Sequence, residues 1–274
     1  MENTAPKLAS TIILHRYTAE AEIYMLRRSS KASFMPNALV FPGGGLDESD
    51  HTDSWVRRSD LEYADAQKQM WVKDERLAHA LMVAAVRETF EESGILLTTE
   101  QNSDFEIRAM LRKELNSGKR SFLSIIESLA LTLDLNGLTF VSRWVTPEVE
   151  RKRFDAYFFI AEAPTDHVGA SADGSETFAG RWKTPASILK AHSERSIQLA
   201  PPTLRAIQTL ALTPSPDWST LRRSHAHAIC PQFDESKPVP TLLMPGDPDF
   251  DPPGTQPNKF ELHDGYWRSV GVGF

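Results

Sequence analysis

The fold is decided by one stretch of the sequence, Arg87-Glu88-Thr89-Phe90-Glu91-Glu92-Ser93-Gly94-Ile95. On a helix, Glu88, Glu91 and Glu92 stand at positions i, i+3 and i+4, which places their carboxylates on one face within an arc of about 100°. A hard dication such as Mg²⁺ prefers an oxygen cluster of this kind, and without a cation the like charges repel one another. The stretch therefore predicts either a metal-binding face or an ordinary solvated acidic face.

The residues before the acidic stretch favour the metal-binding interpretation. Residues 75–93 have helical periodicity, and Gly94 suits the C-terminal cap of a helix. Apolar residues occupy two sides of this helix, so we expect its start to be buried. The carboxylates would then emerge at the rim of a cleft.

A glycine-rich segment lies upstream of the acidic helix. Residues 9–14 and 21–27 are predicted to be strands joined by a turn at 17–20, and residues 38–41 form a third short strand. That strand leads into Pro42-Gly43-Gly44-Gly45, where the backbone can come close to a ligand. A glycine triplet alone is more often a plain turn, so its functional interest comes from the helix downstream.

The rest of the main domain is predicted to alternate strands and helices. The polar residues 47–74 are too long for an ordinary connection and are interpreted as an insertion. Residues 104–133 show two runs of helical periodicity, which predicts a helical hairpin that either packs on the core or covers an apolar ligand. Further strands are expected at 139–145, 156–161 and 178–183, and further helices at 185–193 and 202–212.

The composition changes after Leu212. Ten of the eighteen prolines lie beyond this residue, which predicts a lack of long regular elements. The same segment is rich in aromatic residues for a disordered tail. We therefore expect residues 213–274 to form an irregular C-terminal extension packed on the main domain, which comprises residues 8–212.

Charge and cysteine content exclude several functional classes. The net charge of −7 and the pI near 5.7 argue against binding of nucleic acid or an anionic membrane surface. Cys230 is the only cysteine, so an intrachain disulfide and a cysteine zinc site are excluded. No segment approaches the ~20 apolar residues of a membrane-spanning helix. Residues 271–274 do not form a peroxisomal Ser-Lys-Leu type address, so we expect a cytoplasmic protein.

Two segments of the chain resemble the Nudix box. They are Phe41-Pro42-Gly43-Gly44 and Arg87-Glu88-Thr89-Phe90-Glu91-Glu92-Ser93-Gly94-Ile95. The family pattern runs Gly, five residues, Glu, seven residues, then Arg-Glu-hydrophobic-x-Glu-Glu-x-Gly-hydrophobic. The chain departs from it in three ways: Arg87 follows Gly44 by 43 positions rather than 14, His79 stands where the first Glu is expected, and Thr89 replaces a hydrophobic residue.

With Phe34-Met35-Pro36 ahead of the glycines, the interrupted box is similar to that of the peroxisomal acyl-coenzyme A diphosphatase branch of the Nudix hydrolases. The resemblance covers roughly residues 8–212 and implies an α/β/α sandwich on a mixed β-sheet. The helical insertion and the irregular C-terminal extension are expected from the periodicity and composition described above. It also implies dependence on Mg²⁺ or Mn²⁺ and hydrolysis of a nucleoside diphosphate linked to another moiety. With coenzyme A or acyl-coenzyme A, the products would be 3′,5′-ADP and (acyl-)phosphopantetheine.

Other functions stay open at this point. The substrate could instead be ADP-ribose, NADH or another dinucleotide, and the chain could be a Nudix-fold binding module that has lost turnover. In each case the partner is a small molecule. The sequence does not fix the oligomeric state, and a homodimer is compatible with it.

The resemblance also implies roles for individual residues. Glu88, Glu91 and Glu92, with the carbonyl of Gly44, would hold the metal ions, and Glu88 would take part in catalysis. Arg87 would orient a helix glutamate through a bidentate pair. Glu176, in the polar loop 166–176, is the candidate for a general base or a further metal ligand, the alternative being a solvated loop residue.

Four further residues carry open interpretations. Arg27, Arg28 and Lys31 precede the glycines and could bind the 3′-phosphate of coenzyme A, or could form an ordinary basic surface group. His79 could be a weak substitute for the missing Glu. We favour a histidine that is hydrogen-bonded within the inserted segment.

Overall fold

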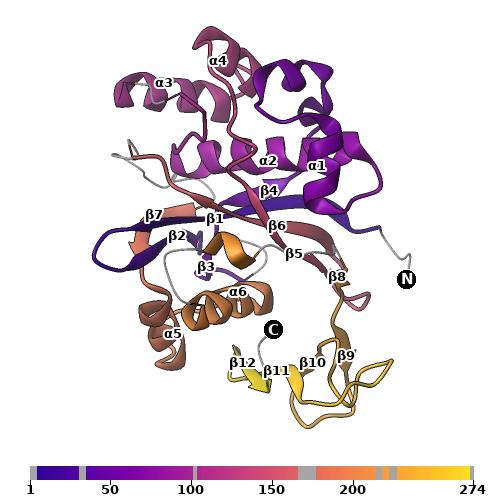
Figure 1. The fold of residues 1–274 in the computed structure, drawn as a ribbon. Helices are drawn as coiled ribbons and strands as arrows, with labels where there is room; N and C mark the ends of the chain where they lie inside the picture. Colours follow the sequence, from indigo (N-terminus) through magenta and orange to yellow (C-terminus); the bar gives the residue numbers. More distant parts are fainter. Residues whose placement is uncertain are drawn as a thin grey trace.

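Strands from the first two thirds of the chain, joined by one short strand at residues 228–229, form one mixed sheet with helices on both of its faces (Figure 1). The computed structural model describes residues 5–30, 35–100, 104–165, 177–213, 218–221 and 227–271. The strands of the large sheet are β1 (Lys7–Tyr17), β2 (Ala21–Arg28), β3 (Leu39–Val40), β4 (Gly43–Gly45), β5 (Thr139–Val145), β6 (Phe154–Glu162), β7 (Thr177–Lys183) and β8 (Ala228–Ile229). Their order confirms the expected α/β/α sandwich on a mixed sheet.

The sheet follows the order β3-β2-β1-β6-β5-β8. The central pair β1 and β6 is parallel, β5 and β8 are parallel, and the other pairs are antiparallel. Strand β7 pairs with β2, and β4 pairs with the start of β1 through Ser10 and Gly44. The glycine segment, for which a plain turn was the alternative, is therefore a short strand at the edge of the sheet.

Both faces of the sheet are buried because helices cover each of them, and successive residues of a strand point to opposite faces. On one face, Ile12 and Leu14 pack against the helices α1 (Tyr63–Met70), α2 (Glu75–Ser93) and α4 (Phe122–Ser128). On the other face, Ile13 joins the cluster of α5 (Pro185–Ser193) and α6 (Pro201–Leu212). Figure 1 shows these two layers of helices above and below the sheet.

Helix α2 has the bounds expected from its periodicity. Asp74 caps its N-terminus by accepting hydrogen bonds from the backbone N–H groups of Arg76 and Leu77. Gly94 ends it in the left-handed conformation, with φ of 77°. The helix is fixed across the sheet by the Ser10 hydroxyl, which donates to the carbonyl of Leu81 at 2.7 Å. Its C-terminal turn is thereby held beside β4.

The insertion 47–74 is ordered and packs on the core through Trp55, which is buried, whereas Trp71 is exposed. It contains two 3₁₀ helices, η1 (Glu48–His51) and η2 (Asp53–Arg58), followed by α1. His79 of α2 faces this segment: its Nε2 lies 3.0 Å from the Ser59 hydroxyl, and its ring contacts the edge of Tyr63. The structure therefore agrees with the interpretation of His79 as a histidine hydrogen-bonded within the insertion.

Burial makes His79 a source of acid sensitivity. It lowers the pKa of His79 from 6.5 to about 4. Between these values the unfolded chain binds one proton more than the folded chain, so stability falls as the pH falls. We expect wild-type protein to lose about 2 kcal/mol of its unfolding free energy through this group between pH 7 and pH 5. In urea unfolding, the free energy of unfolding of a His79→Gln variant should change less with pH between pH 7 and pH 5. An unchanged pH dependence would show that His79 is not the source of the acid sensitivity.

The two helices expected within 104–133 form as α3 (Phe105–Asn116) and α4. The apolar side of α4 joins the core, where Phe122 packs near Trp55 and Phe90. Helix α3 buries Leu111 but leaves Phe105 and Met110 about half exposed. Core packing thus accounts for α4, and only part of α3.

The C-terminal extension contains more regular structure than its proline content predicts. After η3 (Trp218–Leu221), it forms a four-stranded antiparallel sheet in the order β12-β11-β10-β9. These strands are β9 (Gln232–Asp234), β10 (Thr241–Leu243), β11 (Asn258–His263) and β12 (Tyr266–Gly271). Phe260 and Met244 pack in the same cluster as α6. The expectation of irregular structure missed this small sheet.

Within the described ranges, none of the helices combines the length and the apolar character that a bilayer crossing requires.

Candidate functional site

The C-terminal half of α2 and the glycine strand β4 meet at one edge of the large sheet. Glu92 accepts a hydrogen bond from the backbone N–H of Gly43 at 2.9 Å through its Oε2 atom. The carboxylate of Glu88 lies against Gly44, where a Cβ atom would come within 2.4 Å of the Glu88 carboxyl carbon. Arg87 donates from Nη2 to the carbonyl of Gly45 at 2.9 Å. The two halves of the interrupted motif are therefore joined by direct contacts.

The close approach at Gly44 predicts a selective effect of adding one methyl group. In Gly44→Ala, the new Cβ displaces the Glu88 carboxylate, and we expect turnover to fall by about tenfold to a hundredfold because misplaced catalytic groups are costly. Gly45→Ala is the matched control, since no heavy atom lies within 4 Å of a Cβ there. Steady-state kinetics on both variants checks this, and equal activity in the two would contradict it.

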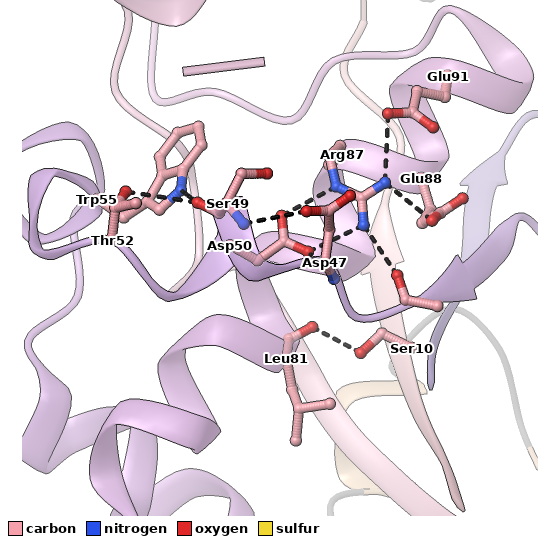
Figure 2. Close-up of polar contacts among 11 residues, drawn as sticks. Ser10, Asp47, Ser49, Asp50, Thr52, Trp55, Leu81, Arg87, Glu88 and Glu91 are labelled. Carbon is pink, nitrogen blue, oxygen red and sulfur yellow. Dashed lines mark hydrogen bonds and ion pairs between the residues drawn. The ribbon is translucent and has the colours of Figure 1, made fainter. Parts of the chain in front are cut away.

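Arg87 is the centre of the polar contacts, as Figure 2 shows. Its Nε and Nη2 atoms donate to the two carboxylate oxygens of Asp50, both at 2.9 Å. Its Nη1 donates to Glu88 at 2.8 Å and to Glu91 at 3.2 Å. The bidentate pair was expected with a helix glutamate, but the structure forms it with Asp50 from the insertion. From Arg87, Glu88 and Glu91 each receive a single hydrogen bond.

Asp50 is held in place by its own local structure. It is buried, and its side chain accepts a hydrogen bond from the backbone N–H of Asp47. Asp47 in turn accepts from the N–H of Ser49, which completes a capping box on η1. The nearby indole of Trp55 donates to the carbonyl of Ser49, so the buried end of the insertion is tied to the same turn. This local network positions a carboxylate against Arg87.

Burial dominates the electrostatics of the helix glutamates. It raises the pKa of Glu88 to about 7, although Arg87 acts to lower it. Burial likewise raises the pKa of Glu91, again opposed by Arg87. Carboxylates in this state would be stabilised in their charged form by an additional cation. The site therefore carries acidic groups that a single arginine does not fully compensate.

The donor atoms gathered here match the chemistry of a hard divalent cation, because they are all oxygen. Arg87 binds one oxygen of Glu88 and one of Glu91, so the Oε2 atom of each stays outside those two hydrogen bonds. Among the residues that the structure describes, however, no three acidic, histidine or cysteine side chains form a ready-made cation site. The set fits a metal ion by donor type and burial, and the ion would complete the geometry.

The expected substrate-binding residues separate on the sheet. Arg28 lines a cavity of about 690 Å³ together with Gly43, Gly44 and Glu92, and its buried Nε atom has no hydrogen-bond partner among the described residues. Arg27 is exposed and does not line this cavity, as expected for a neighbour that points to the other face of β2. Lys31 and Glu176 lie outside the described residues.

Two site features departed from the expected pattern. Asp50 was not singled out in the sequence, where only the Asp47-x-x-Asp50 spacing of a capping box could have indicated its orientation. Thr89 replaces a hydrophobic residue, but it is buried and its hydroxyl donates to the Ala85 carbonyl at 2.8 Å. The substitution is therefore accommodated within the helix.

Comparison with known proteins gives the same family. The model of the NUDT19 Nudix domain matches residues 4–210. An acyl-coenzyme A diphosphatase NUDT19 from Xenopus laevis is 28% identical over 222 residues, covering 68% of this chain and 58% of the relative. The human protein of that name is 26% identical over 229 residues, covering 69% of this chain and 60% of the relative. The chain thus matches less than two thirds of the length of these relatives.

A solved structure supports the fold. The crystal structure of a Nudix hydrolase from Alicyclobacillus acidocaldarius superposes with a TM-score of 0.61 at 26% identity. The match covers 78% of this chain and 95% of that one. Because the family model spans most of the chain and both halves of the interrupted motif meet in space, this protein belongs to the Nudix hydrolase family, in the branch of the NUDT19 Nudix domain.

Proposed function

We propose that this protein is a metal-dependent diphosphatase that hydrolyses coenzyme A or acyl-coenzyme A to 3′,5′-ADP and (acyl-)phosphopantetheine. The observation that carries the proposal is the convergence of Glu88, Glu91 and Glu92 with the glycine strand around Arg87. The similarity to acyl-coenzyme A diphosphatases supports the choice of substrate.

A diphosphate resists hydrolysis because its negative oxygens repel a nucleophile. A bound Mg²⁺ or Mn²⁺ would neutralise those oxygens and make a bound water more acidic. Glu88, Glu91, Glu92 and the carbonyl of Gly44 are the groups that would hold the ion. Arg87 fixes the orientation of Glu88 and Glu91 from one guanidinium nitrogen.

The hydrolytic step requires a base and a leaving group. The oxygen of water forms a bond to one phosphorus while the bond from that phosphorus to the bridging oxygen breaks. The bridging oxygen leaves with the electron pair on the other phosphate, and the water proton passes to the base. Glu176 is our candidate for this base or for a further metal ligand. Arg28, with its buried Nε beside the glycine strand, is our candidate contact for a substrate phosphate.

The substrate assignment is tested by comparing coenzyme A, dodecanoyl-coenzyme A, ADP-ribose and NADH as substrates with Mg²⁺. We expect the coenzyme A compounds to be hydrolysed fastest, with 3′,5′-ADP as a common product. In ¹⁸O-water, mass spectrometry of the products identifies the phosphorus that water attacks. A preference for ADP-ribose or NADH would overturn the choice of substrate.

The same assay separates an enzyme from a binding module. A module without turnover would release no product from any of the four compounds, with or without Mg²⁺ or Mn²⁺. We expect release that depends on the divalent ion and stops with a chelator.

A further inference from the structure

The cavity beside the glycine strand has walls from two parts of the chain that are distant in sequence. One wall is the face of the large sheet that carries Trp144 of β5 and Phe158 of β6. The opposite wall is the small C-terminal sheet, through Phe233, Leu242 and Leu262. The volume of the cavity, about 690 Å³, is in the range of small-molecule sites.

The character of the cavity changes along its length. Next to α2 it is lined by Gly43, Gly44, Glu92 and Arg28, which are the polar groups of the candidate catalytic site. Away from them the lining is dominated by aromatic and aliphatic side chains of β5, β6 and the C-terminal sheet. A ligand that fills this space needs a phosphate-bearing part and a long apolar part.

This pairing discriminates among the candidate substrates. ADP-ribose and NADH carry polar groups on both sides of their diphosphate, and so does coenzyme A without an acyl group. An acyl thioester of coenzyme A adds a hydrocarbon chain, whose burial away from water is favourable. The apolar wall therefore matches a fatty acyl thioester better than the other three compounds.

We propose that the C-terminal sheet completes an acyl-binding compartment, which receives the hydrocarbon chain while the diphosphate lies at the glycine strand. This inference rests on the proposed function, and it identifies the substrate class as esters with long apolar chains. The helices within 104–133 were one expected cover for an apolar ligand, and the C-terminal sheet takes that role instead. Among the described residues, those lining the cavity come mainly from the two sheets, the connection between β5 and β6, the start of α6 and the end of α2, and α3 and α4 contribute none.

Phe233 and Leu262 allow a direct test, because they line the cavity but belong to neither of the two core clusters. We expect wild-type protein to prefer dodecanoyl-coenzyme A over coenzyme A in kcat/KM by about tenfold or more. Phe233→Asp should abolish this preference and leave hydrolysis of coenzyme A near the wild-type rate. Leu262→Asp, a second variant on another strand, should have the same effect.

Val270→Asp is the matched control, since Val270 lies on the same small sheet but does not line the cavity. It should keep the wild-type preference. The compartment would be overturned if wild-type protein did not distinguish the two compounds, or if the two cavity variants kept the preference. Circular dichroism and thermal unfolding verify that each variant is folded.

A binding measurement without turnover separates this inference from the proposed function. With a chelator present, we expect dodecanoyl-coenzyme A to bind wild-type protein about tenfold more tightly than coenzyme A, and Phe233→Asp to remove the difference. If this holds although neither compound is hydrolysed when Mg²⁺ or Mn²⁺ is supplied without the chelator, the compartment stands and the proposed catalytic function fails. Equal binding of the two compounds to wild-type protein would overturn the compartment itself.

Discussion

Replacing Glu91 or Glu92 by glutamine is expected to lower kcat by about a thousandfold, which corresponds to about 4 kcal/mol of transition-state stabilisation. Glutamine keeps the size of the side chain but removes the negative charge that a divalent ion requires. In Glu92→Gln, the amide oxygen can still accept the hydrogen bond from the N–H of Gly43, so we expect little change in fold. Steady-state kinetics over a Mg²⁺ titration measures the effect.

Glu75→Gln provides the control for that experiment. Glu75 lies on the same helix but in its exposed first turn, at the end remote from the glycine strand. Its replacement should leave kcat unchanged. Wild-type turnover in both Glu91→Gln and Glu92→Gln would remove these residues from the metal assignment, while thermal unfolding distinguishes loss of chemistry from loss of structure.

The second large effect is expected at Asp50, which forms the bidentate pair with Arg87. Its side chain is fully buried, and that of Arg87 is 8% exposed, so the pair is shielded from solvent. Asp50→Ala removes the bidentate partner of the buried arginine and both hydrogen bonds that it accepts, although Glu88, Glu91 and the Gly45 carbonyl still contact Arg87. We expect a loss of about 3 kcal/mol in the free energy of unfolding.

The exposed pair of Asp65 and Lys68 gives a matched control. Asp65→Ala removes the same kind of side chain from an ion pair, but solvent screens the pair, and the loss should stay below about 1 kcal/mol. Urea unfolding at neutral pH compares the two variants. Equal losses at Asp50 and Asp65 would show that the buried pair has no special stabilising role.

Asp50 is also expected to influence catalysis, by positioning Arg87. Asp50→Glu keeps the charge but shifts it by one methylene, and Asp50→Asn keeps the size but removes the charge. If Asp50 acts through Arg87, both should lower kcat, and the Mg²⁺ concentration for half-maximal activity should rise in both. If Asp50 contributes only stability, kcat and the Mg²⁺ dependence should stay at wild-type values in the fraction of protein that is folded.

The parts of this fold that were predictable from sequence depend on local chemistry. The bounds of α2 follow from apolar periodicity, an Asp cap and a terminal Gly, all within a segment of about twenty residues. Likewise, β1 and β2 alternate clearly enough to be recognised as strands. The break between α3 and α4 and the helices α5 and α6 were also recognisable from the sequence.

The missed features depend on contacts between distant segments. The pairing of Asp50 with Arg87 joins residues 37 positions apart, and nothing in the intervening sequence specifies it. The C-terminal strands are short and proline-bordered, and they are stabilised by one another and by the α6 layer. Arg27 and Arg28 looked equivalent as neighbours in sequence, but strand geometry separates their side chains.

The origin of Asp50 has a consequence for how this protein can be altered. The extra residues between the two parts of the motif resemble an accessory that could be trimmed to the usual spacing. Their removal would delete the carboxylate that forms the bidentate pair with Arg87, together with the Trp55 contacts that hold it. A shortened chain would match the family spacing more closely but would lose the buried partner that orients its own arginine. Truncated or chimeric versions of this hydrolase therefore need to retain residues 47–59 or supply another buried acid at the same place.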